Sequence, residues 1–162
     1  FGISSIILIM KLFKFILLCL FLISPVNADS IYELIKIPHL EIYNIKWGIV
    51  TNKPCRMTLK LLHKLNLDCP YVISGDTLGA KKPNPKPLYI ACELMNIKSE
   101  DAIYVGDACR DIKAGKDAKM TTITANYGYI KHNDDPNMWG ADFNATSPSH
   151  LSNLVKNLLG EF

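Results

Sequence analysis

From residue 45 onward, short apolar stretches alternate with longer stretches whose apolar residues recur at the spacing of an amphipathic helix. The short stretches end in polar residues or glycine and predict buried strands at residues 46–51, 71–74, 102–106 and 121–124. The longer stretches predict helices at residues 54–65 and 88–95, a loop and helix at 107–117, and a helix from the Ser147-Pro148 cap to about residue 159. In the first of these helices, Leu59, Leu62 and Leu65 fall on one face. Strands that alternate with helices predict an α/β fold with a parallel sheet.

The beginning of the chain has a different pattern. Residues 6–26 are almost continuously apolar, interrupted by Lys11 and Lys14. Read from Met10, the segment resembles a secretory signal that ends at the small residues of 26–28. Read from Ile6, it is about twenty residues long, which suffices for a helix across a bilayer. A third interpretation is a buried strand or helix of the folded domain, since the run at its start is β-prone. Membrane contact through residues 6–26 and incorporation into the fold therefore both stay open.

Composition narrows the function classes. The chain has 162 residues, of which 49% are hydrophobic and 20% charged, enough for one domain with a core. The net charge is only +3, and the Lys and Arg residues are scattered among acids, which excludes a nucleic-acid-binding surface. The five cysteines form no Cys-x-x-Cys pair, so we expect reduced core thiols and neither a zinc site nor a disulfide framework; they are Cys19, Cys55, Cys69, Cys92 and Cys109.

Residues suited to phosphate and metal chemistry follow the predicted strands. Thr51 and Asn52 come after the first strand, and Lys82 lies in the loop rich in glycine and proline after the second. Asp107 and Asp111 come after the third. The carboxyl ends of parallel strands meet at one edge of a sheet, so we expect these side chains to converge there. A hydroxyl, an ammonium and two carboxylates suit a phosphate and a hard divalent cation.

Each of these residues also has an ordinary structural interpretation. Thr51 can simply end a strand or start a turn, and a lysine before proline is usually a solvated loop charge, as Lys82 would then be. Asp107 can be the N-cap of the following helix, and Asp111 can complement the dipole of that helix from its first turn. The order and spacing of the four residues together favour the site.

Three segments resemble motifs of the haloacid dehalogenase superfamily, in the order in which that family carries them. Residues 47–53, a strand that ends in Thr51, resemble its second motif. Lys82 before Pro-Asn-Pro resembles the third, and the Gly-Asp-x-x-x-Asp run within 105–111 resembles the fourth. The resemblance covers residues 41–155. Further segments make it most similar to phosphoglycolate phosphatase and its near relatives; they are residues 74–78, 111–115, 127–130, 134–136 and 139–142.

The resemblance implies a three-layer, Rossmann-like parallel sheet and a Mg²⁺-dependent phosphatase of the cytoplasm. The implied partner is a small phosphorylated metabolite, with 2-phosphoglycolate or a sugar phosphate of cell-wall recycling as candidates. Thr51 would bind the transferring phosphoryl group, and Asn52 would add a phosphate contact. Lys82 would hold the nucleophile and the phosphate together. Asp107 would ligate Mg²⁺, with Asp111 beside it directly or through water.

The printed sequence departs from the family at its beginning. The family's nucleophile and its acid/base residue belong to an Asp-x-Asp-Gly-Thr run after a first strand, and this sequence has no Asp before Asp29. The helical cap that usually follows is also absent. We therefore expect residues 1–30 to form a separate apolar segment and residues 41–160 an incomplete domain of this family, either a fragment of an enzyme or a catalytically dead domain that keeps phosphate and Mg²⁺ binding, tethered to a membrane or exported.

The missing first strand also has a structural consequence. In the family that strand lies at the centre of the sheet, between the strand that ends at Thr51 and the strand that ends at Gly106. An empty central position would leave buried backbone groups unpaired, at a cost of about 1–3 kcal/mol each. Our hypothesis is that another segment fills the position or that the chain does not fold alone. Residues 6–10 are the best candidate because of their β-propensity.

Overall fold

The computed structural model describes residues 6–10, 14–18, 45–128, 130 and 133–160. Its strands are β1 (Ile6–Met10), β2 (Lys14–Leu18), β3 (Trp47–Val50), β4 (Val72–Ile73), β5 (Ala102–Gly106), β6 (Thr121–Ala125) and β7 (Phe143–Ala145). Its α-helices are α3 (Cys55–Lys64), α4 (Lys86–Leu94), α5 (Cys109–Asp117) and α6 (Pro148–Leu159), and short 3-10 helices lie at η1 (Ser99–Asp101) and η2 (Pro136–Trp139).

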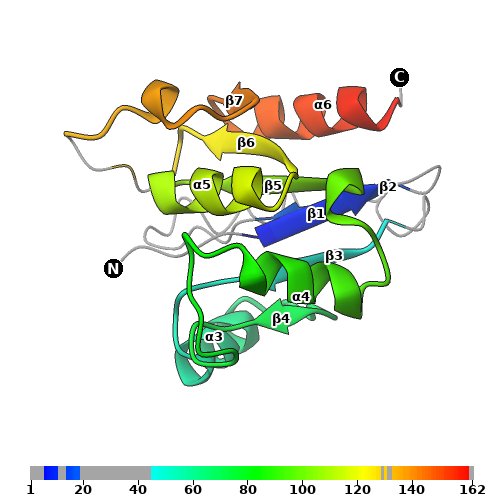
Figure 1. The fold of residues 1–162 in the computed structure, drawn as a ribbon, viewed down its shortest axis with the longest axis vertical. Helices are drawn as coiled ribbons and strands as arrows, with labels where there is room; N and C mark the ends of the chain where they lie inside the picture. The colour runs from blue at the N-terminus through cyan, green and yellow to red at the C-terminus, as the bar shows by residue number, and fades with distance from the viewer. Residues whose placement is uncertain (1–5, 11–13, 19–44, 129, 131–132, 161–162) are drawn as a thin grey trace.

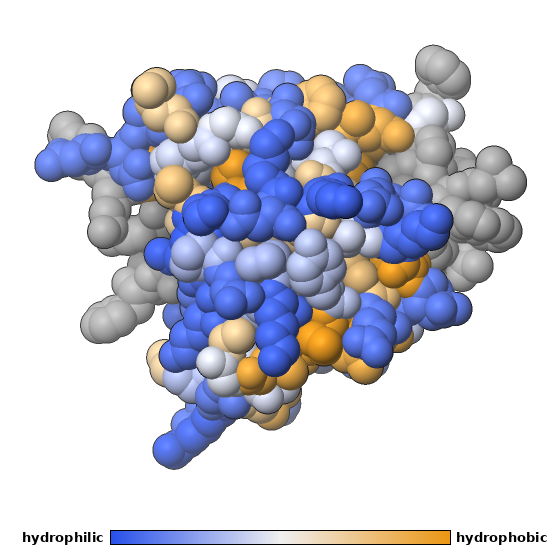
Figure 2. All heavy atoms as spheres, viewed as in Figure 1, coloured by the Kyte–Doolittle hydropathy of each residue, from blue (hydrophilic) through white to orange (hydrophobic). Residues whose placement is uncertain are grey.

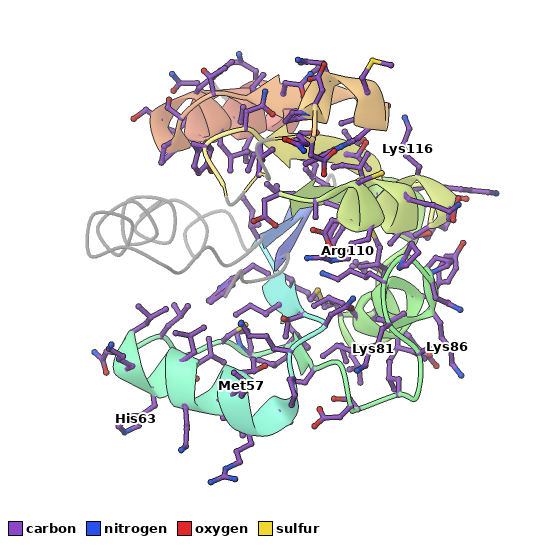
Figure 3. The ribbon with its side chains drawn as sticks, turned by 90° about the vertical axis from the view of Figure 1, so that its left-hand side faces the viewer. Met57, His63, Lys81, Lys86, Arg110 and Lys116 are labelled. Atoms are coloured by element: carbon purple, nitrogen blue, oxygen red, sulfur yellow. The ribbon has the colours of Figure 1, made fainter. Side chains whose placement is uncertain are left out.

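These strands form one sheet in the order β4-β3-β1-β2-β5-β6-β7 (Figure 1). The pairs β3–β4, β5–β6 and β6–β7 are parallel, and β2 is parallel to β5. Only β1 runs the other way among the described strands, antiparallel to β2 and β3. Helices α4 and α5 cover one face of the sheet and α3 and α6 the other (Figure 3). The predicted three-layer α/β fold is confirmed.

The central position of the sheet is filled by β1 and β2. Ile7 of β1 pairs with Gly48 of β3, and Leu17 of β2 pairs with Tyr104 of β5. The strand interpretation of residues 6–10 is therefore confirmed. These two stretches are strands and not parts of a membrane helix, because the gap between β3 and β5 offers their backbone groups hydrogen-bond partners. The rest of residues 6–26 lies outside the described residues, as do residues 30–41, where the boundary between the two expected segments falls.

Helix α3 lies where the sequence predicts it but buries a different stripe. Its buried residues are Thr58 and Leu62, and Leu65 at its end is also buried, whereas Leu59 is 54% exposed. Positions 58, 62 and 65 follow the i, i+4, i+7 spacing of one helix face. Leu59 comes directly after Thr58, so its side chain points about 100° away from that of Thr58 around the helix. The inclusion of Leu59 in the apolar face was wrong. None of the helices in the described ranges is both long and apolar enough to cross a membrane.

The core lies on both faces of β5, whose five residues are all buried. The outer face over α4 and α5 is mostly hydrophilic (Figure 2). Cys92 of α4 is buried in the core, as expected of a core thiol, but Cys55 and Cys109 are exposed. Each of these two cysteines is the first residue of a helix at an edge of the sheet, where the chain has just left the core. The core-thiol expectation therefore fails for Cys55 and Cys109.

Candidate functional site at the carboxyl edge of the sheet

Strands β3, β4, β5 and β6 end at the same edge of the sheet, which faces the viewer in Figure 3. Exposed Arg110, at the start of α5, and exposed Lys81 both lie at this edge. The predicted functional residues are almost completely buried, at 4% exposure or less; they are Thr51, Lys82, Asp107 and Asp111.

Lys82 is buried, with only 3% of its surface exposed. Its Nζ donates to the main-chain oxygen of Val50 at 2.8 Å and to the hydroxyl of Tyr104 at 2.9 Å. The same Nζ lies 3.0 Å from Oδ1 of Asp111. The ammonium group thus has two hydrogen-bond acceptors and one ion-pair partner. The alternative interpretation of Lys82 as a solvated loop charge is wrong, because β3, β5 and α5 supply partners for its ammonium group.

The main chain of Lys82 is bonded to Asn52. The side-chain Nδ2 of Asn52 donates to the main-chain oxygen of Lys82 at 2.9 Å, and its Oδ1 accepts from the main-chain N–H of Lys82 at 2.9 Å. The loop after β4 is therefore tied to the end of β3 by the side chain of one residue.

Thr51 directly follows β3, and its side chain is buried. Its Oγ1 accepts a hydrogen bond from the main-chain N–H of Lys53 at 3.1 Å, which forms a small turn. Its own N–H donates to the main-chain oxygen of Ile73 at 2.9 Å. The Thr51 hydroxyl donates a hydrogen bond to no described residue. It can therefore accept from Lys53 in the turn and donate its O–H to a ligand at the same time. Partial burial lowers the pKa of the neighbouring Lys53.

The two aspartates occupy different surroundings. Asp107 follows β5 directly, while α5 begins at Cys109 with Ala108 as its N-cap and no side-chain cap. Asp107 is therefore not the helix cap that one interpretation allowed. Asp111 lies in the first turn of α5, fully buried, with Oδ1 beside Lys82. Its other oxygen, Oδ2, has no hydrogen-bond partner among the described residues.

Glycine is required beside Asp111. A Cβ on Gly106 would lie 2.4 Å from the Cβ of Asp111, closer than side-chain carbons approach. The last residue of β5 must therefore lack a side chain for α5 to place Asp111 against the end of the strand.

Sequence reasoning missed Tyr104 and the contact of Asn52 with Lys82. Tyr104 is fully buried in the middle of β5, and its hydroxyl accepts from Lys82. The available signal was a hydroxyl in an otherwise apolar strand, since a buried tyrosine usually bonds its O–H. The contact between Asn52 and Lys82 joins residues far apart in sequence, and no local pattern indicates it.

Residues 27–125 of the chain match the model of the family described as haloacid dehalogenase-like hydrolase. An N-acetylmuramic acid 6-phosphate phosphatase of Pseudomonas putida is 38% identical over 118 residues, which are 72% of this chain and 53% of that protein. A phosphoglycolate phosphatase of Xylella fastidiosa is 43% identical over 116 residues, 70% of this chain and 50% of that protein. The chain spans about half the length of the curated relatives it matches.

Solved structures share the fold. A protein described as a predicted phosphoglycolate phosphatase from Haemophilus somnus has a TM-score of 0.69 at 23% identity, over 79% of this chain and 55% of its own. A HAD-superfamily hydrolase from Ehrlichia chaffeensis has a TM-score of 0.65 at 24% identity, over 81% of this chain and 58% of its own. At these identities the similarity is one of fold.

Proposed function

Since this chain belongs to the haloacid dehalogenase-like hydrolase family, we propose that it forms the phosphate- and Mg²⁺-binding part of a phosphatase that hydrolyses a small phosphate monoester. One observation supports the proposal above the others: the buried ion pair of Lys82 and Asp111 lies at the carboxyl edge of the sheet, where Thr51 and Asp107 directly follow their strands. Open α/β sheets bind their ligands at this edge.

The substrate class is a small phosphorylated metabolite. The relatives' names favour two compounds, 2-phosphoglycolate and N-acetylmuramic acid 6-phosphate. We take 2-phosphoglycolate as the first candidate, because the motifs of residues 74–78 and 111–115 are most similar to that branch. The sugar phosphate is the second.

Three residues of the site contribute to phosphate binding in different ways. The hydroxyl of Thr51 donates a hydrogen bond to a phosphate oxygen. Lys82 offsets the phosphate charge, and its attraction is strengthened because the ammonium lies in a buried, low-dielectric place. Asp111 keeps the ammonium at this position through their 3.0 Å contact.

The carboxylates fit a magnesium ion as part of its ligand set. Mg²⁺ is usually held by one or two carboxylates together with waters and phosphate oxygens. Asp107 follows β5, Asp111 lies in the first turn of α5, and the buried Oδ2 of Asp111 has no hydrogen-bond partner among the described residues. We assign the direct ligand to Asp107 and place Asp111 beside it, where it also bonds Lys82. A bound Mg²⁺ would neutralise phosphate charge.

A second candidate function is phosphate and Mg²⁺ binding without turnover. The observation in its favour is that β1 and β2 occupy the place between β3 and β5 where the family carries its nucleophile strand, and neither contains an aspartate. Without a nucleophile no aspartyl phosphate forms. We expect the chain alone to bind phosphate and Mg²⁺ and to show no phosphatase activity.

The test measures turnover and binding on the same protein. The purified chain is assayed with p-nitrophenyl phosphate, 2-phosphoglycolate and N-acetylmuramic acid 6-phosphate, with and without Mg²⁺, and phosphate binding is measured by calorimetry. Mg²⁺-dependent phosphate binding that Asp107→Ala abolishes supports the site. Turnover that Asp107→Ala abolishes would refute binding without turnover, together with our expectation that the chain alone is inactive. Absence of both binding and turnover would refute both functions.

A second protein separates the two candidates. Residues 1–40 are replaced by the corresponding N-terminal part of the Xylella fastidiosa relative. If the chain is the working part of a phosphatase, the chimera hydrolyses a phosphate monoester and Asp107→Ala abolishes this activity. A folded chimera that binds phosphate but shows no turnover supports the second candidate, binding of phosphate and Mg²⁺ without catalysis.

A further inference from the structure

Asn52 makes an unusual pair of hydrogen bonds with the main chain of Lys82. Both polar groups of its side-chain amide are engaged, with Nδ2 donating to the oxygen of Lys82 and Oδ1 accepting from its N–H, each at 2.9 Å. We propose that Asn52 is a positioning residue that fixes Lys82 in the site, and that this is its role in place of the phosphate contact implied by the family resemblance. The importance of this role for chemistry rests on the proposed function.

The two hydrogen bonds act as one clamp, which we call the Asn52 clamp. A single bond would leave the main chain of Lys82 free to pivot about it. Two bonds from one planar amide fix both the distance and the orientation of the Lys82 backbone, as one rung of a β-ladder does. The loop that carries Lys82 has no strand of its own to provide such pairing.

The clamp determines where the ammonium lies. The end of β3 holds Lys82 at both ends, since Asn52 bonds its backbone and the main-chain oxygen of Val50 accepts from its Nζ at 2.8 Å. A lysine side chain has four rotatable bonds and loses much conformational entropy when it is fixed. With its backbone clamped, Nζ comes within 3.0 Å of Asp111.

Asn52 itself is held firmly. A Cβ on Gly75 would lie 2.1 Å from the main-chain oxygen of Asn52, so the loop after β4 passes directly against it. The N–H of Gly75 also donates to the main-chain oxygen of Lys53 at 2.7 Å. The clamp therefore starts from a backbone that the loop after β4 braces at Gly75. One N–H of Nδ2 is not needed for the clamp, so direct phosphate contact is the competing role that an experiment must separate.

The test uses the reactivity of lysines toward acetic anhydride, measured site by site by mass spectrometry on the folded chain. Lys81 is exposed and adjacent to buried Lys82, so it serves as an internal reference. The variants are Asn52→Ala, which removes both bonds, and Asn52→Asp, which keeps the acceptor for the Lys82 N–H and loses the donor. Asn84→Ala is the matched control, because it removes an exposed asparagine of the same loop whose Oδ1 accepts from the Lys86 N–H at 2.9 Å.

We expect Asn52→Ala to raise the labelling of Lys82 relative to Lys81 by roughly ten- to thirtyfold, the effect of losing two neutral hydrogen bonds. Asn52→Asp should give a smaller rise and Asn84→Ala none. If Lys82 stays protected in Asn52→Ala while the affinity for inorganic phosphate with Mg²⁺ falls, Asn52 is a phosphate contact and the proposal is wrong. A similar rise at half-buried Lys46 in both Asn52 variants would also overturn it, since that result indicates general unfolding.

The two proposals fail in different ways. Lysine labelling reports the clamp without any ligand, and calorimetry with inorganic phosphate and Mg²⁺ reports the binding site. A wild-type chain that binds no phosphate contradicts the proposed function, and the labelling of Lys82 still decides whether Asn52 positions it.

Discussion

The ammonium of Lys82 and the carboxylate of Asp111 lie 3.0 Å apart with both side chains fully buried. Lys82 comes from the loop after β4 and Asp111 from the first turn of α5, so the contact joins the two halves of the domain across the end of the sheet. A buried charge that loses its partner is strongly unfavourable, because nothing then compensates its desolvation.

Removal of one partner should therefore destabilise the chain strongly. We expect Asp111→Ala to lower the free energy of unfolding by about 3–5 kcal/mol, since it leaves the Lys82 ammonium buried without its carboxylate. The double variant Lys82→Met with Asp111→Leu should recover most of this loss, because two apolar side chains can fill the same space without charge. Urea denaturation followed by circular dichroism measures both.

The control is the ion pair of Lys113 and Asp117 on the surface of α5. Its atoms are 2.8 Å apart, closer than in the buried pair, but its side chains are 60% and 42% exposed. Asp117→Ala should change the free energy of unfolding by no more than about 0.5 kcal/mol. A similar loss in Asp117→Ala and Asp111→Ala would show that burial does not determine the importance of these pairs.

Gly106 should be intolerant of a side chain for a steric reason. The new Cβ in Gly106→Ala would lie 2.4 Å from the Cβ of Asp111, so either α5 or the end of β5 must move. We expect a loss of about 1–3 kcal/mol in unfolding free energy and weaker Mg²⁺ binding, because Asp107 is the next residue in the chain and Asp111 is the residue that the new Cβ meets.

Gly79→Ala provides the comparison. Gly79 has a φ of +63° and no atom within 4 Å of its Cβ position, so alanine there strains the backbone without a clash. The expected loss is about 1 kcal/mol, with Mg²⁺ affinity unchanged in a calorimetric titration. Equal effects of the two variants on Mg²⁺ affinity would contradict a specific role of Gly106 beside Asp111.

The hairpin of β1 and β2 should be essential for folding of the chain. Ile7 pairs with Gly48 of β3 and with Leu18 of β2, at the centre of the sheet. Ile7→Pro removes a backbone N–H and is incompatible with a central strand, so we expect loss of cooperative thermal unfolding. Ile7→Val keeps the β-propensity and should unfold like the wild type. A cooperative transition of unchanged midpoint in Ile7→Pro would refute the central placement of β1.

Local patterns in the sequence sufficed for the strands and helices that carry the candidate site. β5 is a fully buried apolar run, and α6 begins at the Ser147 cap, whose Oγ accepts from the His150 N–H at 3.1 Å. Both signals are encoded within a few residues, so they can be read without the fold. The order of Thr51 and Lys82 along the chain can likewise be read from the sequence without knowledge of the fold.

Long-range contacts could not be read in this way. β7 has only three residues, and it is a strand because Thr124 and its neighbours pair with it, not because of its own apolar pattern. Likewise, the partners of Lys82 come from β3, β5 and α5, and only the folded sheet brings them together. Residue type and order thus indicate a site, whereas the bonds within it depend on the tertiary structure.

Asp142, directly before β7, joins that strand's start to β6 and α5. Its Oδ2 accepts from the N–H and the hydroxyl of Thr122 at 2.8 and 2.7 Å, and its Oδ1 lies 2.5 Å from Nζ of Lys116. Burial alone would raise the pKa of this carboxyl, but the hydrogen bonds from Lys116 and Thr122 outweigh burial and lower the pKa below its usual 3.8.

A lowered pKa in the folded state makes the contribution of Asp142 depend on pH. The stabilisation is fully present above the pKa of the unfolded chain, near 3.8, and is lost as the pH falls through the lower pKa of the folded state. We expect Asp142→Asn to cost about 1 kcal/mol at pH 7, a modest value because the side chain is 36% exposed and solvent screens its charge. The difference between wild type and variant should shrink as the pH is lowered below about 4.

Urea denaturation of both proteins between pH 3 and pH 7 measures this difference. The weak surface pair of Lys119 and Glu100, with atoms 3.7 Å apart, supplies the control variant Glu100→Gln, which should match the wild type throughout. A difference between wild type and Asp142→Asn that stays constant to pH 3 would show that the neutral hydrogen bonds to Thr122, and not the carboxylate charge, hold β7 in place.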